Sequence, residues 1–337
     1  MSVQPRDRVE SLHGAPPGHA TVPVGDLPLE VVTVSSKFFG GFWPTIREIW
    51  GYRELLGQLV RKELKVKYKD SVLGFLWTLL RPLLQLVVYS LAIGYFLGNS
   101  KNIPGFGVYL FTGLVAWTLF GEIIGGCTGS IVGNGALIGK VYFPRELFPL
   151  SVVGAAIVNF GLQLIVLLAA YVVTWSWPKP SNLLLVPVAL IALVVFSLAL
   201  GLVLAAANVY LRDMTYLVEV AMLLWFWMTP IVYDWTKVRT HLVCQGGTTA
   251  PNGTACQVTD NHLLWVLQVY LANPMADVVL AFQRALWPGG LTAKGRPFYY
   301  SGDLYLRLGV VIGICLVLLW LAQRVFARAQ GNFAQEL

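Results

Sequence analysis

Long apolar stretches without charged side chains follow one another along most of the chain. Pro82–Ser100 and Asn102–Gly121 contain no charged residue, and Leu147–Pro178 is separated from Pro180–Leu211 only by Lys179. An α-helix needs roughly 20 apolar residues to cross a bilayer, so such stretches are candidate spans. The pattern predicts an all-α integral membrane protein with six transmembrane helices, at about residues 76–98, 105–131, 149–174, 182–209, 214–233 and 304–325.

An amphipathic stretch, Phe42–Tyr68, precedes the first expected span. Its apolar residues recur at three- and four-residue steps, which is the spacing of one face of a helix. Such a helix can lie at the membrane interface with its cations at lipid phosphates, and packing on the protein itself is the alternative. We expect residues 41–70 to form an interface helix, with headgroup contacts from Arg47, Arg53, Arg61, Lys62 and Lys65.

Residues 1–40 lack this periodicity. Prolines and glycines recur through them, as at Pro16, Pro17 and Gly18. A segment of this composition cannot bury enough apolar surface to fold, so we predict a disordered tail. No charged segment leads into an apolar core there, and no cleavable signal peptide is expected. Residues 71–337 then form the transmembrane domain.

Composition and charge agree with a membrane protein. The chain is 56% hydrophobic and 12% charged, about half the roughly 25% charge of soluble domains. Lys and Arg gather before the first span, after the last, and in the loops that share their side, which predicts that both termini are cytoplasmic. This bias and contact with anionic headgroups explain the net charge of +7 without any nucleic-acid partner.

A loop over residues 234–303 lies on the opposite, extracytoplasmic side. Cys244 and Cys256 flank a Gly- and Thr-rich turn in it, and thiols in an oxidising compartment tend to pair. We expect a disulfide between them, with two free thiols as the alternative. Cys127 and Cys315 lie within expected spans and are predicted to be small core residues.

The second half of this loop, His262–Leu286, is moderately apolar and is divided by Pro274. Each piece is shorter than a span. We therefore expect two half-helices that dip toward the outer surface as re-entrant or gate helices, which is tolerated where protein or a water-filled cavity surrounds them. The alternative is a true pair of spans, which would give eight crossings.

The sequence shows no pattern of an active site. The stretch GNGALIGKV has Asn134 where a phosphate-binding P-loop has Gly, and Val141 where it has Ser or Thr. The four His residues are scattered, so no metal site is predicted. We expect a transport protein that is not an enzyme and holds no cofactor. A membrane enzyme acting on polyprenyl-linked sugars is the alternative, and it would need clustered carboxylates.

Charged and aromatic residues inside the spans are candidates for a channel lining. Glu122 would cost roughly 2.5–3.5 kcal/mol at mid-bilayer, so it should face a cavity or a partner, or form a buried structural pair. Aromatic rings can stack on sugars, although packing or an interfacial belt would also use them. The aromatic candidates are Tyr89, Tyr95 and Phe96 in the first span and Trp225, Phe226 and Trp227 in the fifth.

The segment Asn134–Leu150, NGALIGKVYFPRELFPL, carries charges between the second and third spans. Lys140, Arg145 and Glu146 cannot lie in hydrocarbon, so the segment should be at the cytoplasmic water interface. It is short and amphipathic. We predict that residues 134–150 form a docking element for a soluble partner.

Several segments in order resemble the ABC-2-type polysaccharide export permeases, the membrane subunits of O-antigen-type exporters. Lys67–Tyr89 resembles the start of that family's first span, and Asn134–Ser151 resembles its cytoplasmic coupling segment. The likeness extends over roughly residues 40–337. The other matching segments are Ala207–Val220, Thr229–Tyr233, Ala272–Trp287 and the C-terminal NFAQEL.

This resemblance implies a homodimer that works with two copies of a cytoplasmic ABC ATPase, which would bind ATP and Mg. It implies export of a polyprenyl-pyrophosphate-linked glycan across the bacterial cytoplasmic membrane. The composition favours an actinobacterial cell-wall galactan, with O-antigen and teichoic acid as alternatives. The first and fifth spans would line the channel, and the residues pressing into the ATPase would be Lys140, Val141, Tyr142, Phe143, Pro144, Arg145 and Glu146.

Overall fold

The structure is a computed structural model in which residues 42–337 form one unit by their contacts. It describes residues 42–68, 76–96, 98, 103–138, 143–175, 177–235, 268–288 and 304–336. The predicted tail, the central residues Lys140–Tyr142 of the coupling segment, and the expected Cys244–Cys256 disulfide lie outside the described residues.

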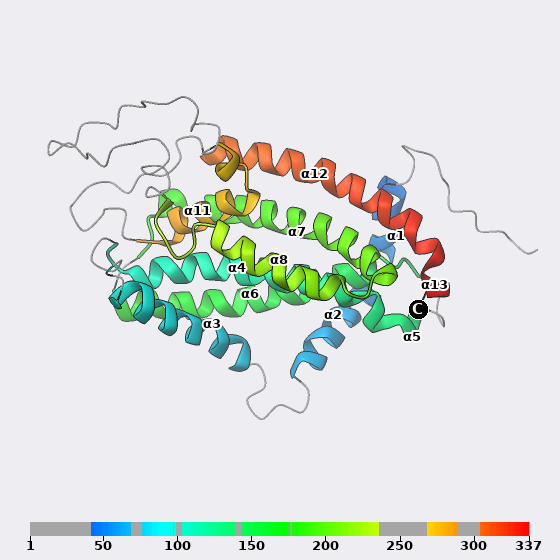
Figure 1. Cartoon of the computed structure of the whole chain (residues 1–337), viewed down its shortest axis with the longest axis horizontal. Coiled ribbons are helices and arrows are strands. Elements are labelled where there is room, and N and C mark those ends of the chain that lie inside the picture. The colour runs from blue at the N-terminus through cyan, green and yellow to red at the C-terminus, as the bar shows by residue number, and fades with distance from the viewer. Residues whose placement is uncertain are drawn as a thin grey trace, which may run out of the picture. The chain divides into compact units, whose positions relative to one another are not determined.

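Four long helices run side by side through this unit (Figure 1). They are α4 (Phe106–Ser130), α6 (Leu147–Thr174), α7 (Leu185–Tyr210) and α12 (Leu304–Ala329). In the described part of the chain these are the helices long and apolar enough to cross a membrane. Helix α4 packs on α6 and α7, and α12 packs along α7. The all-helical membrane fold predicted from the uncharged stretches is therefore present.

The other two expected spans are also helical but shorter. Helix α3 (Leu76–Tyr89) continues as a π-helix, η2 (Ser90–Phe96), and α8 covers Met214–Met228. Helix α8 contains 15 residues, and at about 1.5 Å per residue it is too short to cross a bilayer unaided. The predicted helices are thus present at all six places, while the count of six spans stays a prediction.

The amphipathic stretch forms two helices rather than the single one predicted. Helix α1 (Phe42–Gly51) and α2 (Arg53–Tyr68) meet at a turn at Tyr52. Helix α2 packs on α6 so closely that a Cβ added to Gly154 would lie 2.6 Å from Val60 Cγ2. One side of α2 is therefore fixed to the protein, and Arg53, Arg61 and Lys65 are exposed on its surface.

The main core lies among α4, α6, α7 and the short helix α11 (Pro274–Leu286). Helix α11 begins at Pro274, the position where the sequence predicted a break, and Asn273 caps it by accepting from the Met275 amide at 3.1 Å. All side chains from Met275 to Gln283 are buried. Cys127 and Cys315 are buried in this core, as the sequence predicted.

The unit has two ends, which are built from different parts of the chain (Figure 1). We call one the loop end, made of residues 229–235 and 268–288, which includes α11. The other is the coupling end, made of residues 131–138, 143–150 and 326–336. The coupling end contains the short helix α5 (Gly135–Ile138) and the C-terminal α13 (Phe333–Glu336).

Candidate functional site

The coupling segment is Asn134–Leu150. Its described part begins at Asn134, the end of the 3-10 turn η4 (Val132–Asn134), and includes the helix α5 and a turn at Phe143–Glu146 that leads into α6. Leu147 and Phe148 begin α6 with their side chains buried. The segment contributes Ile138, Leu147 and Phe148 to a small apolar cluster with residues of α7 and α12. The start of α6 is thereby fixed to the rest of the coupling end.

The first half of the segment is tied to α2. Lys62 donates a hydrogen bond from Nζ to Asn134 Oδ1. The same amide donates from Nδ2 to the Ser130 carbonyl at 2.8 Å, so it closes the C-terminal end of α4. Lys62, predicted to lie at lipid headgroups, thus holds the coupling segment. The headgroup role of Lys62, like that of Arg47, Arg53, Arg61 and Lys65, stays a prediction.

The second half of the segment is tied to the C-terminus. Arg145 donates from a guanidinium nitrogen to the backbone carbonyl of Gln330. Its guanidinium carbon also lies 5.7 Å from the centre of the Phe333 ring, within the range of a cation–π contact. Sequence separation gives no sign of this pairing, because Arg145 and Gln330 are 185 positions apart.

Glu146 lies beside this contact and is buried, with 5% of its surface exposed. Burial raises the pKa of its carboxyl above the ordinary value, because water no longer solvates the charge. A hydrogen bond from its own backbone amide lowers the pKa, the nearby Glu48 raises it, and Arg145 lowers it. The Glu146 carboxyl therefore lies largely shielded from water at the start of α6.

Phe143 and Pro144 complete the turn and are half-buried. The Phe143 ring lies 5.3 Å from that of Phe148. Leu137 is a large apolar residue of α5 that lies exposed, with 37% of its surface accessible. The predicted ATPase contacts of Phe143–Glu146 stay predictions.

Glu122 forms a polar group with two residues that the sequence did not single out for this role. It accepts from Lys67 Nζ at 3.1 Å and from Asn159 Nδ2 at 2.8 Å. The three residues come from α4, α2 and α6, so the group joins the end of the amphipathic helix to two spans. The Lys67 and Glu122 side chains are 41% and 24% exposed, which leaves this pair accessible.

The aromatic candidates separate into two groups. Tyr89 of α3 stacks on Phe226 of α8, with ring centres 5.9 Å apart. Trp225 points into the core, where its ring meets those of Phe120 and Phe196. By contrast Tyr95, Phe96 and Trp227 are exposed. The Tyr89–Phe226 contact joins the end of α3 to α8, and both helices also pack on α4.

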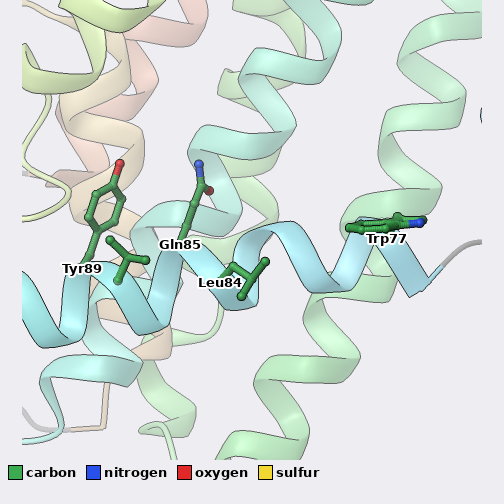
Figure 2. Close-up of a pocket in the computed structure, with 5 residues that line it drawn as sticks. Trp77, Leu84, Gln85 and Tyr89 are labelled. Carbon is green, nitrogen blue, oxygen red and sulfur yellow. The ribbon is translucent and has the colours of Figure 1, made fainter. Parts of the chain in front are cut away.

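A groove of about 360 Å³ runs along α3. Figure 2 shows Gln85 and Tyr89 projecting from the same side of α3, one helical turn apart, with Trp77 nearer the start of the helix. Leu84 and Val88 complete its lining. The groove is apolar apart from one amide and one phenol, which suits a hydrocarbon chain or the apolar face of a sugar.

At the loop end, Asn273 is a hydrogen-bonding centre that sequence reasoning missed. It accepts from Trp225 Nε1 at 2.9 Å and donates to Thr229 Oγ1 at 3.3 Å, in addition to capping α11. An Asn directly before Pro at a helix start is a capping signal, and that signal could have identified it.

No cluster of potential metal ligands occurs among the described residues.

Comparison with known proteins gives a consistent result. Residues 54–241 match the family described as ABC-2 type transporter. The chain is 32% identical to an O-antigen export system permease protein of Myxococcus xanthus over 87% of its own length and 98% of the relative's. A permease of the same name from Klebsiella pneumoniae is 27% identical, over 84% of this chain and 95% of that one. A polysialic acid transport protein of Escherichia coli is 20% identical, over 77% and 90%.

Proposed function

The chain belongs to the ABC-2 type transporter membrane family, and from this premise we propose that it exports a polyprenyl-pyrophosphate-linked polysaccharide across the cytoplasmic membrane. It is the permease subunit of a polysaccharide exporter. The observation that carries the finer proposal is the near full-length similarity to permeases named for O-antigen export. O-antigen, galactan and teichoic acid share one feature here, a long polymer delivered on a lipid.

In the proposed assembly two copies of the chain form the conduit, and two ATPase subunits bind at the coupling end, which faces the cytoplasm. Tyr89 of α3 stacks on Phe226 of α8, which supports both helices contributing to one wall of the conduit. The apolar groove on α3 would accept part of the lipid or the glycan. Glu122 and Lys67 would line the cytoplasmic part of the same wall.

Energy enters through the coupling segment. ATP binding closes the two ATPases, and the segment moves with them. Because the turn Phe143–Glu146 leads directly into α6, and Lys62 ties Asn134 to α2, displacement of the segment shifts both helices. A rigid-body shift of packed helices can open a path without any chemistry in the permease.

The test is reconstitution in liposomes with the partner ATPase and a fluorescent lipid-linked glycan. We expect ATP-dependent transfer of the glycan to the opposite leaflet, with its mass unchanged. Mass spectrometry that finds sugars added to or removed from the glycolipid would favour the alternative, an enzyme of polyprenyl-linked sugars. Transfer of a free glycan at the same rate as the lipid-linked one would overturn the lipid requirement.

Docking can be tested with a matched pair of surface substitutions. Leu137→Ser removes an exposed apolar residue of α5, whereas Leu183→Ser changes a similarly exposed leucine (41% exposed) ahead of α7 at the opposite end. We expect Leu137→Ser to weaken co-purification of the ATPase and Leu183→Ser to leave it unchanged. Equal effects of the two substitutions would contradict docking at the coupling end.

A further inference from the structure

The direction of the Arg145 side chain is the starting observation. Arg145 belongs to the segment expected to meet the ATPase, yet its guanidinium is directed to the protein's own C-terminal turn, η6 (Gln330–Asn332). It donates to the Gln330 carbonyl and lies over the Phe333 ring at 5.7 Å. A guanidinium that both donates and stacks is held in one orientation, which a lysine at this position would not reproduce.

The receiving side of this contact is itself fixed. Phe333 is fully buried, and its ring lies 5.5 Å from that of Phe326 on α12 and 6.3 Å from that of Tyr210 on α7. The Tyr210 hydroxyl donates to the Ala329 carbonyl at 3.0 Å, at the end of α12. The C-terminal residues 330–336 are therefore anchored by the ends of two long helices.

We propose that residues 330–336 form a fixed support for the coupling segment, which we call the C-terminal rest. Arg145 is a positioning residue whose side chain joins the segment to this support. This inference relies on the proposed function, because the rest matters only if the segment transmits force. It adds a second route by which movement of the segment would reach the long helices. Displacement of the segment would pass through Arg145 and Phe333 to α12 and α7, as well as directly into α6.

The alternative role for Arg145, a direct ionic contact with the ATPase, makes a different prediction for Phe333. If Arg145 acts through the rest, removing the Phe333 ring face should have the same effect as removing the guanidinium, and the two changes together should add little. If Arg145 contacts the ATPase, the two changes should be independent. A double-mutant cycle separates these cases.

The experiment uses Arg145→Gln, Phe333→Leu and the double variant, in the full chain. Phe333→Leu keeps an apolar side chain in the buried site and removes only the ring. Gly331→Ala is the matched control, because a Cβ at Gly331 would meet nothing within 4 Å. Thermal unfolding of each purified variant confirms that it is folded.

The first measurement is hydrogen–deuterium exchange of the backbone amides of residues 143–150 in the permease alone. We expect exchange about tenfold faster in Arg145→Gln and in Phe333→Leu, no further increase in the double variant, and no change in Gly331→Ala. Unchanged exchange in Phe333→Leu overturns the proposal. Because no ATPase is present, this result does not depend on the proposed function.

The second measurement is ATP-driven export per ATP hydrolysed in the reconstituted complex. We expect each single variant to lower this ratio by about tenfold, and the double variant to match the single ones. Additive losses would show that Arg145 acts on the ATPase directly and would refute its positioning role. Absence of export by the unaltered chain would instead contradict the proposed function, whatever the exchange measurement gives.

Discussion

The loop end and the coupling end are held together by different kinds of contact. At the loop end, buried side chains of α11 fill the space beside α4 and α7, and side-chain donors of this end bond backbone carbonyls of neighbouring segments. Trp287 Nε1 donates to the Pro104 carbonyl at 3.0 Å, and Gln283 Nε2 donates to the Pro230 carbonyl at 3.1 Å. At the coupling end, Ile138, Leu147 and Phe148 pack in a small apolar cluster. Two long cationic side chains, Lys62 and Arg145, tie the segment to α2 and to the C-terminal turn.

This difference bears on which end can move. Moving a closely packed element opens voids and leaves buried hydrogen-bonding groups unpaired, so displacing the loop end would cost much free energy. A contact made by one long cationic side chain can break and re-form while the helices on either side stay intact. The gate role expected for His262–Leu286 stays a prediction. The described part of the loop end is closely packed, whereas the contacts of Lys62 and Arg145 at the coupling end are of the kind that can break and re-form.

The largest expected effect is the loss of stability from removing a buried ring at the loop end. Phe282 is fully buried and packs edge-to-face on Phe160, with ring centres 5.9 Å apart. We expect Phe282→Ala to lower the free energy of unfolding by about 3–5 kcal/mol. Phe143→Ala at the coupling end is the comparison, and its half-buried ring should cost clearly less. Equal losses in denaturant unfolding of the two variants would remove the distinction between the ends.

The next effect concerns the packing of α2 on α6. A Val at position 154 would collide with Val60, whose Cγ2 would lie 2.6 Å from the new Cβ. We expect Gly154→Val to lower the free energy of unfolding by about 1–3 kcal/mol through overpacking, and to reduce export because α2 is displaced. Gly161→Val on the same helix is the control, since a Cβ there meets nothing within 4 Å. A variant at position 154 that melts and exports like the control would show that α2 is not seated by this contact.

A smaller effect is expected for the pair Lys67–Glu122. Because both side chains are partly exposed, the ion pair should contribute less than about 1 kcal/mol, and added salt should weaken it. Glu122→Gln keeps an oxygen that can accept from Asn159. We therefore expect a slight loss of thermal stability at low salt and none at high salt. If export falls while stability is kept, the lining role predicted for Glu122 gains support over a purely structural one.

The smallest effect is a change in the pH dependence of stability at the coupling end. Burial raises the pKa of Glu146 in the folded protein above its ordinary value of 4.5, so the folded state binds the proton more tightly than the unfolded state. The free energy of unfolding should therefore fall as pH rises from 4.5 through the raised pKa. We expect Glu146→Gln to lose this dependence and to be the more stable protein at neutral pH. Parallel pH profiles for the two proteins would contradict the burial of this charge.

The sequence predicted the helices well because each long uncharged stretch leaves the backbone little choice but a helix in a membrane. The start of α11 at Pro274 was also predictable, because proline favours the first turn and blocks the interior of a helix. The turn at Tyr52 was not predicted, although Gly51 directly before it ends α1, because a single glycine is also tolerated within a helix. The π-helix from Ser90 was not predicted because no local sequence signal marks its start.

The candidate site was predictable as a segment but not as a set of contacts. The charges of Arg145 and Glu146 placed the segment at an interface. Which way Arg145 points depends on a partner 185 positions away, and a single sequence carries no signal of that pairing. Similarly, Lys62 was grouped with the headgroup cations because its charge and helical position match theirs, while Asn134 was not considered as its partner.

The central claim is that ATP-driven motion enters at the coupling end while the loop end stays fixed. The most direct test is hydrogen–deuterium exchange of the reconstituted exporter, without nucleotide and with ATP trapped on a hydrolysis-deficient ATPase. We expect changed exchange in residues 131–138 and 143–150, and unchanged exchange in residues 274–288. Changes confined to residues 274–288, with the coupling segment unaffected, would contradict it.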